Sequence, residues 1–251
     1  MTPFLLPPVI AHRGAAGAAP ENTLAAFRLA AAHGAPWVEF DVRQSADGRC
    51  VVFHDETLER ICARPDRIDE TPLAVLNHLD AGSWFDPAFA DQTIPTVEQA
   101  LEVLTQLGRG VVIEIKDAPG AEAGLAECVL KALAKLWPAS LPVVVSSFEA
   151  KIVAQLRDRA PDLPGALIGR QFSTALLNRA EELDCVSLHL RHDDLGRDSV
   201  ARVKQLGLQL AVWSVEDPAR ADELWRWGVD AIITRRPDVI MAARQAYERT
   251  P

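Results

Sequence analysis

The chain has 251 residues, of which 49% are hydrophobic and 24% charged, with a formal net charge of −9. This balance is that of a globular protein and excludes a disordered, collagen-like or disulfide-scaffold protein. The negative charge, with no run of five Lys and Arg residues, argues against a nucleic-acid binder. About 250 residues is the usual length of one (β/α)₈ barrel, so we expect a single domain over residues 1–251.

Short apolar runs alternate with helix-like patterns along the chain, which is typical of a parallel sheet. The runs are rich in Val, Ile and Leu, as expected for strands buried on both faces. Eight such units fit a closed α/β TIM barrel. The predicted strands are Pro8–His12, Trp37–Val42, Val111–Ile115, Val143–Ser147, Gly165–Ile168, Cys185–Leu190, Leu208–Trp213 and Asp230–Ile233.

Helices are predicted from apolar residues three and four apart and from residues that start or stop helices. The first is expected to begin directly after Pro20 and to end before Gly34. The predicted helices are Glu21–Ala32, Val97–Leu107, Leu125–Leu136, Ala150–Arg159, Asp198–Leu206, Pro218–Trp227 and Val239–Tyr247. The alternation is interrupted between His54 and Pro95, and because this stretch is too long for a plain loop, residues 56–95 are predicted to form a small insertion after strand two.

The four cysteines, at positions 50, 62, 128 and 185, form no C-x-x-C pair. We therefore expect reduced side chains, as is usual in a cytosolic protein. No apolar stretch approaches the roughly 18 residues of a membrane helix, and the first residues lack the basic segment of an export signal. The sequence predicts a cytoplasmic protein without stable membrane association.

Polar side chains interrupt the predicted strands at their carboxyl ends, which in a barrel form the catalytic face. Because side chains alternate along a strand, Glu39 and Asp41 point the same way, and so do Glu114 and Lys116. Three converging carboxylates would repel one another, so a divalent cation is their natural partner. Carboxylate oxygens favour Mg²⁺, Ca²⁺ or Mn²⁺ over zinc, and we favour Mg²⁺. The alternative is that Arg13 and Lys116 neutralise them as ordinary ion pairs.

Two histidines lie near these charges. His12 ends the first strand, and His54 ends a second apolar run, Val51–Phe53, which a turn returns to the barrel mouth. Either histidine alone would be an ordinary hydrogen-bonded residue, but beside cations and carboxylates the two indicate an acid and base pair. The other polar or aromatic strand ends are Ser146, Ser147, His189 and Trp213, and surface positions are expected for His33, His78 and His192.

Taken in order, short motifs from residue 9 to about 240 resemble the glycerophosphodiester phosphodiesterases, particularly the bacterial cytoplasmic type. Each motif alone is weak, and their order makes the resemblance specific. The motifs are His12-Arg13-Gly14, Pro20-Glu21-Asn22-Thr23, Glu39-Phe40-Asp41, His54-Asp55, Thr57-Leu58-Glu59-Arg60, Asp80-Ala81-Gly82-Ser83-Trp84, Ile94-Pro95-Thr96, Glu114-Ile115-Lys116, Ser146-Ser147-Phe148 and the stretch Trp225–Ile233.

The resemblance implies a metal held by Glu39, Asp41 and Glu114, with phosphate oxygens held by Arg13 and Lys116. It implies substrates such as glycerophosphocholine, glycerophosphoethanolamine and glycerophosphoglycerol, cleaved to sn-glycerol 3-phosphate and an alcohol. The glycerol hydroxyl would attack phosphorus to form a cyclic phosphate that water opens. We assign the first-step base to His12 and the acid to His54, although the sequence leaves the reverse assignment open.

Three further residues have two interpretations each. Phe148 and Trp213 either form the glycerol side of the pocket or pack within the barrel, and His189 either touches substrate or hydrogen-bonds a residue that does. The chain departs from many relatives in having Arg235 and Arg236 after the last strand, where the added charge would favour an anionic substrate, and in Ile61 and Cys62, which would change the insertion's inner surface.

Other functions remain possible on sequence alone. A phospholipase D-like lipid hydrolase would need an apolar rim, for which Trp84, Phe85 and Phe89 are the candidates. A non-catalytic barrel that binds glycerophosphodiesters would be expected to have lost a carboxylate or a histidine, and none is missing. A generic barrel aldolase or isomerase is less favoured, since the pattern points to no Schiff-base lysine. Oligomeric state is not predicted.

Overall fold

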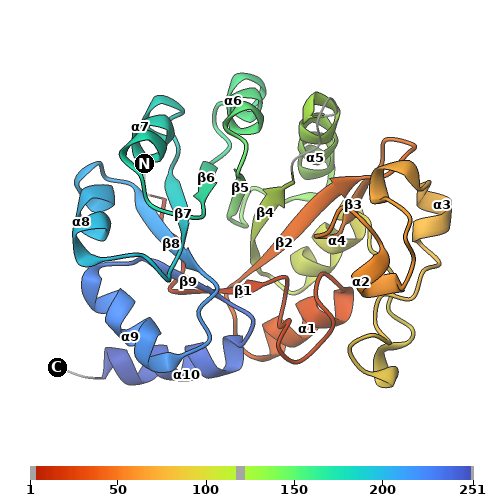
Figure 1. Ribbon diagram of the computed structural model, residues 1–251, viewed down its shortest axis with the longest axis horizontal. Helices are drawn as coiled ribbons and strands as arrows, with labels where there is room; N and C mark the ends of the chain where they lie inside the picture. Colours follow the sequence, from red (N-terminus) through yellow and green to blue (C-terminus); the bar gives the residue numbers. More distant parts are fainter. Residues whose placement is uncertain (1–3, 117–121, 250–251) are drawn as a thin grey trace.

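The computed structural model describes residues 4–116 and 122–249, in which eight parallel strands close into a barrel (Figure 1). Neighbouring strands follow the order β1-β9-β8-β7-β6-β5-β4-β2, and β1 also pairs with β2, which closes the circle. The predicted (β/α)₈ TIM barrel is confirmed. The barrel strands are β1 (Val9–His12), β2 (Trp37–Gln44), β4 (Gly110–Ile115), β5 (Val143–Ser147), β6 (Gly165–Gly169), β7 (Ser187–Arg191), β8 (Gln209–Trp213) and β9 (Ala231–Thr234).

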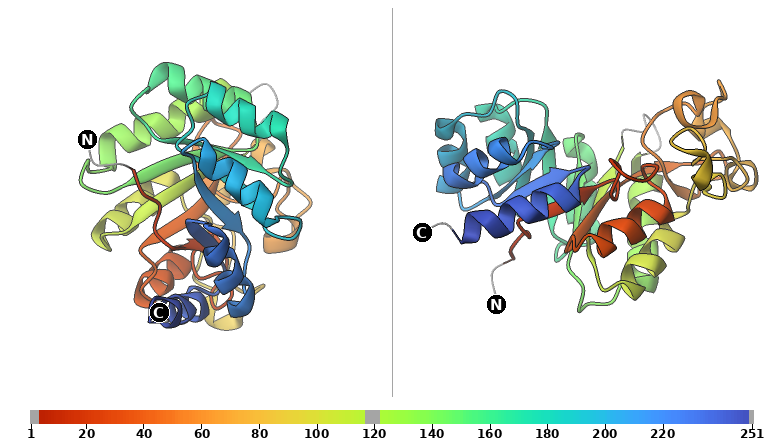
Figure 2. Two further views of the ribbon diagram at one scale, coloured as in Figure 1. Left: turned by 90° about the vertical axis from the view of Figure 1, so that its left-hand side faces the viewer. Right: turned by 90° about the horizontal axis from the view of Figure 1, so that it is seen from below.

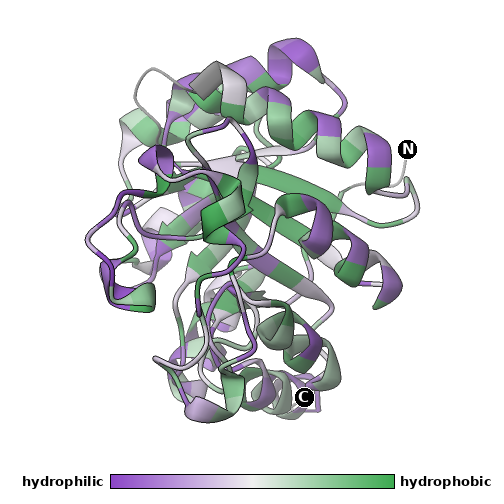
Figure 3. Ribbon diagram, turned by 90° about the vertical axis from the view of Figure 1, so that its right-hand side faces the viewer, coloured by the Kyte–Doolittle hydropathy of each residue, from purple (hydrophilic) through white to green (hydrophobic). Residues whose placement is uncertain are grey.

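Helices surround these strands, and Figure 3 shows the largely apolar strands at the centre with mixed polar and apolar turns outside. Each helix packs an apolar stripe against the barrel and leaves its polar residues outside. The helices outside the insertion are α1 (Leu24–Ala32), α4 (Val97–Gln106), α5 (Glu122–Leu136), α6 (Ala150–Arg159), α7 (Thr174–Glu182), α8 (Arg197–Gln205), α9 (Pro218–Trp227) and α10 (Pro237–Glu248).

Helices α1, α5 and α7 differ most from the sequence prediction, and α5 begins at Glu122 rather than at Leu125. Helix α1 begins at Leu24 rather than directly after Pro20, because the Thr23 hydroxyl accepts a hydrogen bond from the Ala26 N–H at 3.2 Å and caps the helix. Helix α7 was not among the predicted helices; it begins after Ser173, whose hydroxyl accepts a hydrogen bond from the Leu176 N–H at 3.1 Å, and it buries Leu177 and Ala180.

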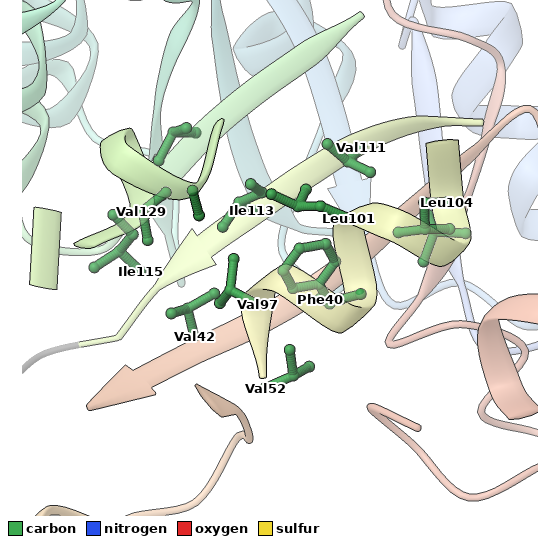
Figure 4. Close-up of a cluster of buried hydrophobic side chains, with 14 of the residues drawn as sticks. Phe40, Val42, Val52, Val97, Leu101, Leu104, Val111, Ile113, Ile115 and Val129 are labelled. Atoms are coloured by element: carbon green, nitrogen blue, oxygen red, sulfur yellow. The ribbon is translucent and has the colours of Figure 1, made fainter. Parts of the chain in front are cut away.

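Because side chains alternate along the strands, the interior of the barrel is apolar near the amino ends of the strands and polar near their carboxyl ends. Residues that point inward near the amino ends form one apolar cluster, and the next inward positions toward the carboxyl ends are polar, including Glu39, Glu114 and His189. Outward-pointing residues of β2 and β4 pack against α1, α4 and α5. Figure 4 shows Phe40 and Ile113 beside side chains of α4 and α5, including Leu101 and Val129. The fold therefore concentrates its inward polar groups at one end of the barrel.

The segment after strand two forms an insertion beside the barrel, on the side of the molecule away from α9 and α10 (Figure 2, right). A short antiparallel strand, β3 (Cys50–Val52), pairs with the end of β2. The insertion then has two short helices, α2 (Glu59–Cys62) and α3 (Leu73–Leu76), and two 3₁₀ turns, Ile68–Glu70 and Pro87–Phe89. Its own core consists of Val51, Phe53, Leu58, Ile61, Ile68, Leu76, Ala81 and Ile94.

The aromatic residues of the insertion do not form a broad exposed rim. Phe85 contacts both Trp84 and Phe89 edge-on, with ring centroids 5.8 Å apart in each pair. Of the three, only Trp84 is exposed, at 40%. Within the described ranges, no helix is both long and apolar enough to cross a bilayer.

The prediction of four reduced cysteines is wrong for two of them. Cys50 of β3 and Cys128 of α5 are paired as a disulfide, with Cα atoms 6.2 Å apart, whereas Cys62 and Cys185 are free. The pair is 78 residues apart in sequence, so only the folded barrel brings it together. The cytoplasmic location stays a prediction.

Phe27 tests the packing of α1 on the barrel, since it is fully buried and its ring lies 5.7 Å from that of Phe40. We expect Phe27→Ala to lower the free energy of unfolding by about 3–5 kcal/mol, because it leaves a cavity in a closely packed layer. Leu5→Ala, at a position 64% exposed, should change it by less than about 0.5 kcal/mol. Urea unfolding measures both, and equal effects would contradict this packing.

Candidate active site

A cavity of about 780 Å³ opens at the carboxyl ends of the barrel strands. Every predicted site residue lines it except Asp41, which is fully buried behind it. The lining residues are His12, Arg13, Glu39, Arg43, His54, Glu114, Lys116, Ser146, Phe148, Glu149, Ile168, Gly169, Arg170, His189, Trp213, Ser214 and Ile233.

Three buried carboxylates meet at one side of this cavity. Oxygen atoms of Glu39, Asp41 and Glu114 all lie within 4.8 Å of one another, and register places Asp41 directly beside Glu114 on neighbouring strands. Burial, together with the charges of Asp41 and Glu114, raises the pKa of Glu39 well above its usual range. Burial also raises the pKa of Glu114, against the opposing effect of Lys116. The predicted convergence of the carboxylates is present.

Asp41 forms ion pairs with both cations of the site, Arg13 and Lys116. Its Oδ1 lies 2.7 Å from Lys116 Nζ, and its Oδ2 lies 3.1 Å from Arg13 Nε and accepts a hydrogen bond from Asn22 Nδ2 at 2.7 Å. Burial alone would raise the pKa of Asp41, but Lys116 and Arg13 hold it well below its usual range. Lys116 also contacts the Glu114 carboxylate. The ion pairs considered as the alternative interpretation are therefore present as well.

The cations do not satisfy the whole cluster. Glu39 Oε2 accepts a hydrogen bond from the Arg13 backbone N–H at 2.9 Å, but Glu39 Oε1 is buried and no group in the described part of the chain donates to it. A buried carboxylate oxygen without a partner is costly. Three carboxylates with this free oxygen are a donor set that suits a hard divalent cation. The residues present thus fit a metal site.

His12 contacts Ser214 through one ring nitrogen and faces Glu39 with the other. Its Nδ1 and the Ser214 hydroxyl are 2.8 Å apart, and its Nε2 lies 3.8 Å from Glu39 Oε2. Burial, reinforced by the charge of Arg13, lowers the pKa of His12 well below its usual range. The ring is therefore neutral near pH 7, and its Nε2 faces the carboxylate cluster.

His54 approaches the cavity from the loop after β3. Its Nδ1 lies 2.6 Å from Asp55 Oδ1, and because a carboxylate only accepts hydrogen bonds, the Nδ1 proton points to Asp55. Burial alone would raise the pKa of Asp55, but hydrogen bonds from His54 and Arg60 lower it below its usual range. Arg43 Nε fixes the backbone by donating to the His54 carbonyl at 2.7 Å. His54 Nε2 is the nitrogen left for proton exchange.

The opposite side of the cavity is aromatic and less charged. Phe148 and Trp213 meet edge-on with ring centroids 6.0 Å apart, and the Arg170 guanidinium lies 5.4 Å from the Phe148 ring centroid. His189 is buried, 3.1 Å from the Ser187 hydroxyl, and burial lowers its pKa to about 4. His189 is thus a neutral hydrogen-bonding group at the cavity.

Sequence reasoning gave no site role to several residues that the structure places at the site. Glu21 and Asn22 were placed inside the predicted first helix, whereas they lie in the loop before α1 and Asn22 has a positive φ of 59°. Asp55 follows His54 directly, and Ser214 follows the last residue of β8, so both lay within the strand-end pattern. Glu21 was noted only as part of the motif Pro20-Glu21-Asn22-Thr23, and Arg43 gave no signal beyond its charge.

The two arginines that follow the last barrel strand, β9, do not line the cavity. Arg235 pairs with Glu216 at 2.8 Å and Arg236 with Asp238 at 3.0 Å, and neither arginine lines the cavity. Ile61 is buried in the core of the insertion.

The chain matches known proteins along nearly its whole length. Residues 12–239 match the glycerophosphoryl diester phosphodiesterase family. The chain belongs to this family. It is 32% identical to a glycerophosphodiester phosphodiesterase of Caldanaerobacter subterraneus subsp. tengcongensis, over 93% of this chain and 96% of that one. It is also 35% identical to the Bacillus subtilis (strain 168) protein YhdW, with the same coverage of both chains.

A solved structure gives a similar result. An Oleispira antarctica phosphodiesterase in complex with the product sn-glycerol-3-phosphate aligns with a TM-score of 0.93 and 37% identity, covering 96% of this chain and 97% of that chain. The prediction that the chain is an enzyme of this family is confirmed.

The carboxylate cluster makes a stability prediction for the metal-free protein. Because folding raises the pKa of Glu39, the folded state binds more protons than the unfolded chain between the two pKa values, and stability falls as pH rises through that interval. Glu39→Gln removes this loss. In EDTA at about pH 8, we expect the variant to melt at least about 2 °C above wild type, the shift that roughly 1 kcal/mol gives at this size.

The difference should shrink toward about pH 4, where an ordinary glutamate is itself mostly protonated. Glu181→Gln, at an exposed position of α7, is the matched control and should not melt differently from wild type. Thermal melts followed by circular dichroism measure all three proteins. A Glu39→Gln variant that melts at or below wild type at both pH values would contradict the charge repulsion.

Proposed function

We propose that the protein hydrolyses glycerophosphodiesters to sn-glycerol 3-phosphate and an alcohol in this cavity. The observation that carries the proposal is that three carboxylates, two cations and two histidines meet at one barrel mouth. The two histidines have different partners, since His12 Nδ1 contacts the Ser214 hydroxyl and His54 Nδ1 contacts the Asp55 carboxylate. Family membership and the product bound in the Oleispira antarctica relative support it. Glycerophosphocholine, glycerophosphoethanolamine and glycerophosphoglycerol are the proposed substrates.

The cations bind the charged centre of the substrate. Arg13 Nε and Nη1 pair with Asp41 and Glu21, so its planar guanidinium would offer its other amino group to phosphate oxygens, and Lys116 would add a point charge. Glu39, Asp41 and Glu114 would hold a divalent cation, which we propose to be Mg²⁺, with Mn²⁺ and Ca²⁺ as the other ions that suit these ligands. When bound, the ion supplies Lewis-acid stabilisation of the charge that develops on the phosphoryl oxygens.

His12 is proposed as the base of the first step. Burial keeps its imidazole neutral, and Ser214 binds Nδ1, so Nε2 is directed toward the charged side of the cavity. As the glycerol hydroxyl oxygen forms its bond to phosphorus, the hydroxyl proton moves to His12 Nε2.

His54 is proposed as the acid of that step. Asp55 stabilises the charged imidazolium, and Nε2 donates its proton to the alcohol oxygen as the bond between phosphorus and that oxygen breaks. The products are the free alcohol and a cyclic phosphate. Water then attacks phosphorus, His54 accepts the water proton, and His12 returns its proton to the glycerol oxygen as the ring opens.

The remaining cavity residues are proposed to bind the substrate outside the phosphate. Phe148 and Trp213 form an apolar wall suited to the carbon chain of the glycerol. His189, neutral and buried, is placed to exchange hydrogen bonds with a hydroxyl.

Metal dependence is tested by measuring release of glycerol 3-phosphate from glycerophosphocholine and glycerophosphoethanolamine. Purified protein should release it from both, lose the activity after EDTA, and regain it with Mg²⁺. Parallel reactions with Mn²⁺ and Ca²⁺ rank the ions. Activity that persists unchanged in EDTA would contradict the metal site, and release of head groups from phospholipid vesicles alone would favour a lipid hydrolase instead.

The histidine roles are tested by single substitutions. His54→Ala and His12→Ala should each lower kcat by about 10²- to 10⁴-fold, because each removes a positioned proton donor or acceptor. The matched control is His78→Ala, at an exposed position of the insertion, which should keep wild-type activity. Full activity in the His54→Ala protein, with its melting temperature unchanged, would show that His54 is not the acid.

A further inference from the structure

Arg60, in helix α2 of the insertion, binds two carboxylates at once. Its Nε donates to Asp55 Oδ2 at 2.6 Å, while Nη1 and Nη2 donate to Glu21 Oε2 and Oε1 at 2.9 and 2.7 Å. The guanidinium thus uses the edge that suits bidentate binding for Glu21 and its remaining nitrogen for Asp55.

Each of these carboxylates also holds a residue of the proposed catalytic site. Asp55 Oδ1 lies 2.6 Å from His54 Nδ1, and Glu21 Oε1 lies 2.8 Å from Arg13 Nη1. The Arg60 guanidinium is therefore linked through one carboxylate to His54, the proposed acid, and through another to Arg13, the proposed phosphate-binding residue.

We propose that Arg60 is a positioning residue that fixes His54 and Arg13 relative to each other through Asp55 and Glu21. The inference rests on the proposed function, because it assigns a role in that reaction. Arg60 does not line the cavity, so it acts through other side chains and does not touch substrate.

The surroundings of Arg60 support a fixed geometry. Its guanidinium lies 5.7 Å from the ring centroid of Trp84, whose Nε1 donates to the Ala81 carbonyl at 2.9 Å. Asp80 in turn accepts the backbone N–H groups of Gly82 and Ser83, each at 2.9 Å. The turn 80–84 is thereby ordered by its own hydrogen bonds and holds an aromatic ring against the arginine.

Loss of Arg60 would leave two carboxylates without a cation between them. Asp55 would then be free to rotate away from His54, and Glu21 would keep only Arg13 among its described partners. Because proton transfer depends on distances of a few tenths of an ångström, small rotations of His54 have large effects on the rate. The effect is expected mainly on kcat, through His54, with a smaller rise in KM, through Arg13.

Arg64 provides a matched control in the same segment. Its side chain is 46% exposed, close to the 44% of Arg60, and it pairs with Asp66 at 2.7 Å. Asp66, its partner, does not line the cavity. An ordinary surface ion pair contributes little, so Arg60 and Arg64 should behave alike if Arg60 has only that role.

The test compares wild type, Arg60→Ala and Arg64→Ala with glycerophosphocholine as substrate. We expect Arg60→Ala to lower kcat by about 10- to 100-fold, as loss of an outer partner of a site residue does. Arg64→Ala should stay within about twofold of wild type. Millimolar guanidinium should restore part of the Arg60→Ala activity, whereas sodium chloride at the same ionic strength should not, a response that a general loss of structure would not give.

Double substitutions locate the connection. If Arg60 acts through Asp55, then combining Arg60→Ala with Asp55→Asn should be scarcely slower than the slower single variant. Glu21→Gln tests the other branch in the same way, with KM as the parameter that changes.

The outcomes separate this inference from the proposed function. Wild-type protein that releases no glycerol 3-phosphate overturns the proposed function. Active wild type with an equally active Arg60→Ala protein overturns only the role of Arg60. If Arg60→Ala does not fold, Arg60→Lys decides, because a lysine keeps the charge but cannot bind both carboxylates with a fork. A folded Arg60→Lys protein with wild-type kcat would overturn the inference, and one at least about tenfold slower would support it.

Discussion

The buried charge of Asp41 is the constraint on which the active end of the barrel depends. A carboxylate with no exposed surface must be paired and hydrogen-bonded, or it would destabilise the fold strongly. Its partners come from two segments: Arg13 and Asn22 lie at the two ends of the loop between β1 and α1, and Lys116 follows β4. Pairing this one carboxylate therefore fixes both ends of the β1–α1 loop and the residue after β4, and with them the positions of His12 and Glu39 beside Arg13.

The same cluster is unbalanced, and the imbalance is useful. Two cations, Arg13 and Lys116, face three carboxylates, and Glu39 keeps an oxygen without a partner among the described residues. If side-chain cations neutralised all three carboxylates, the site would be more stable, but it would have no unbalanced negative charge with which to bind a metal cation. Active sites commonly give up stability in this way for binding and chemistry. The pairing of Asp41 limits the cost to Glu39, the carboxylate that keeps an oxygen without a partner among the described residues.

The side chains whose convergence could be predicted from the sequence are those whose direction follows from strand geometry. Glu39, Asp41 and Glu114 occupy alternate positions of buried strands, so their convergence could be deduced once a parallel barrel was assumed. Their partners were harder to find because they lie in loops, where no repeat sets the direction of a side chain. Asn22 and Ser214 belong to this group.

Residue pairs far apart in sequence were missed for a related reason. The Cys50–Cys128 pairing joins β3 to α5 across 78 residues, and no local pattern encodes that contact. Spacing rules for cysteines detect motifs within a short stretch of chain.

The insertion is explained by the location of His54. His12 ends a barrel strand, but His54 lies on a loop beyond the short strand β3, where a side chain is held less precisely than on a barrel strand. Three contacts compensate: Arg43 binds its carbonyl, Asp55 binds its ring, and the insertion packs its own apolar core beneath the loop, including Phe53. A barrel with only its eight strands would offer no second surface on this side. The insertion gives the loop histidine the rigid support that the barrel gives the strand histidine.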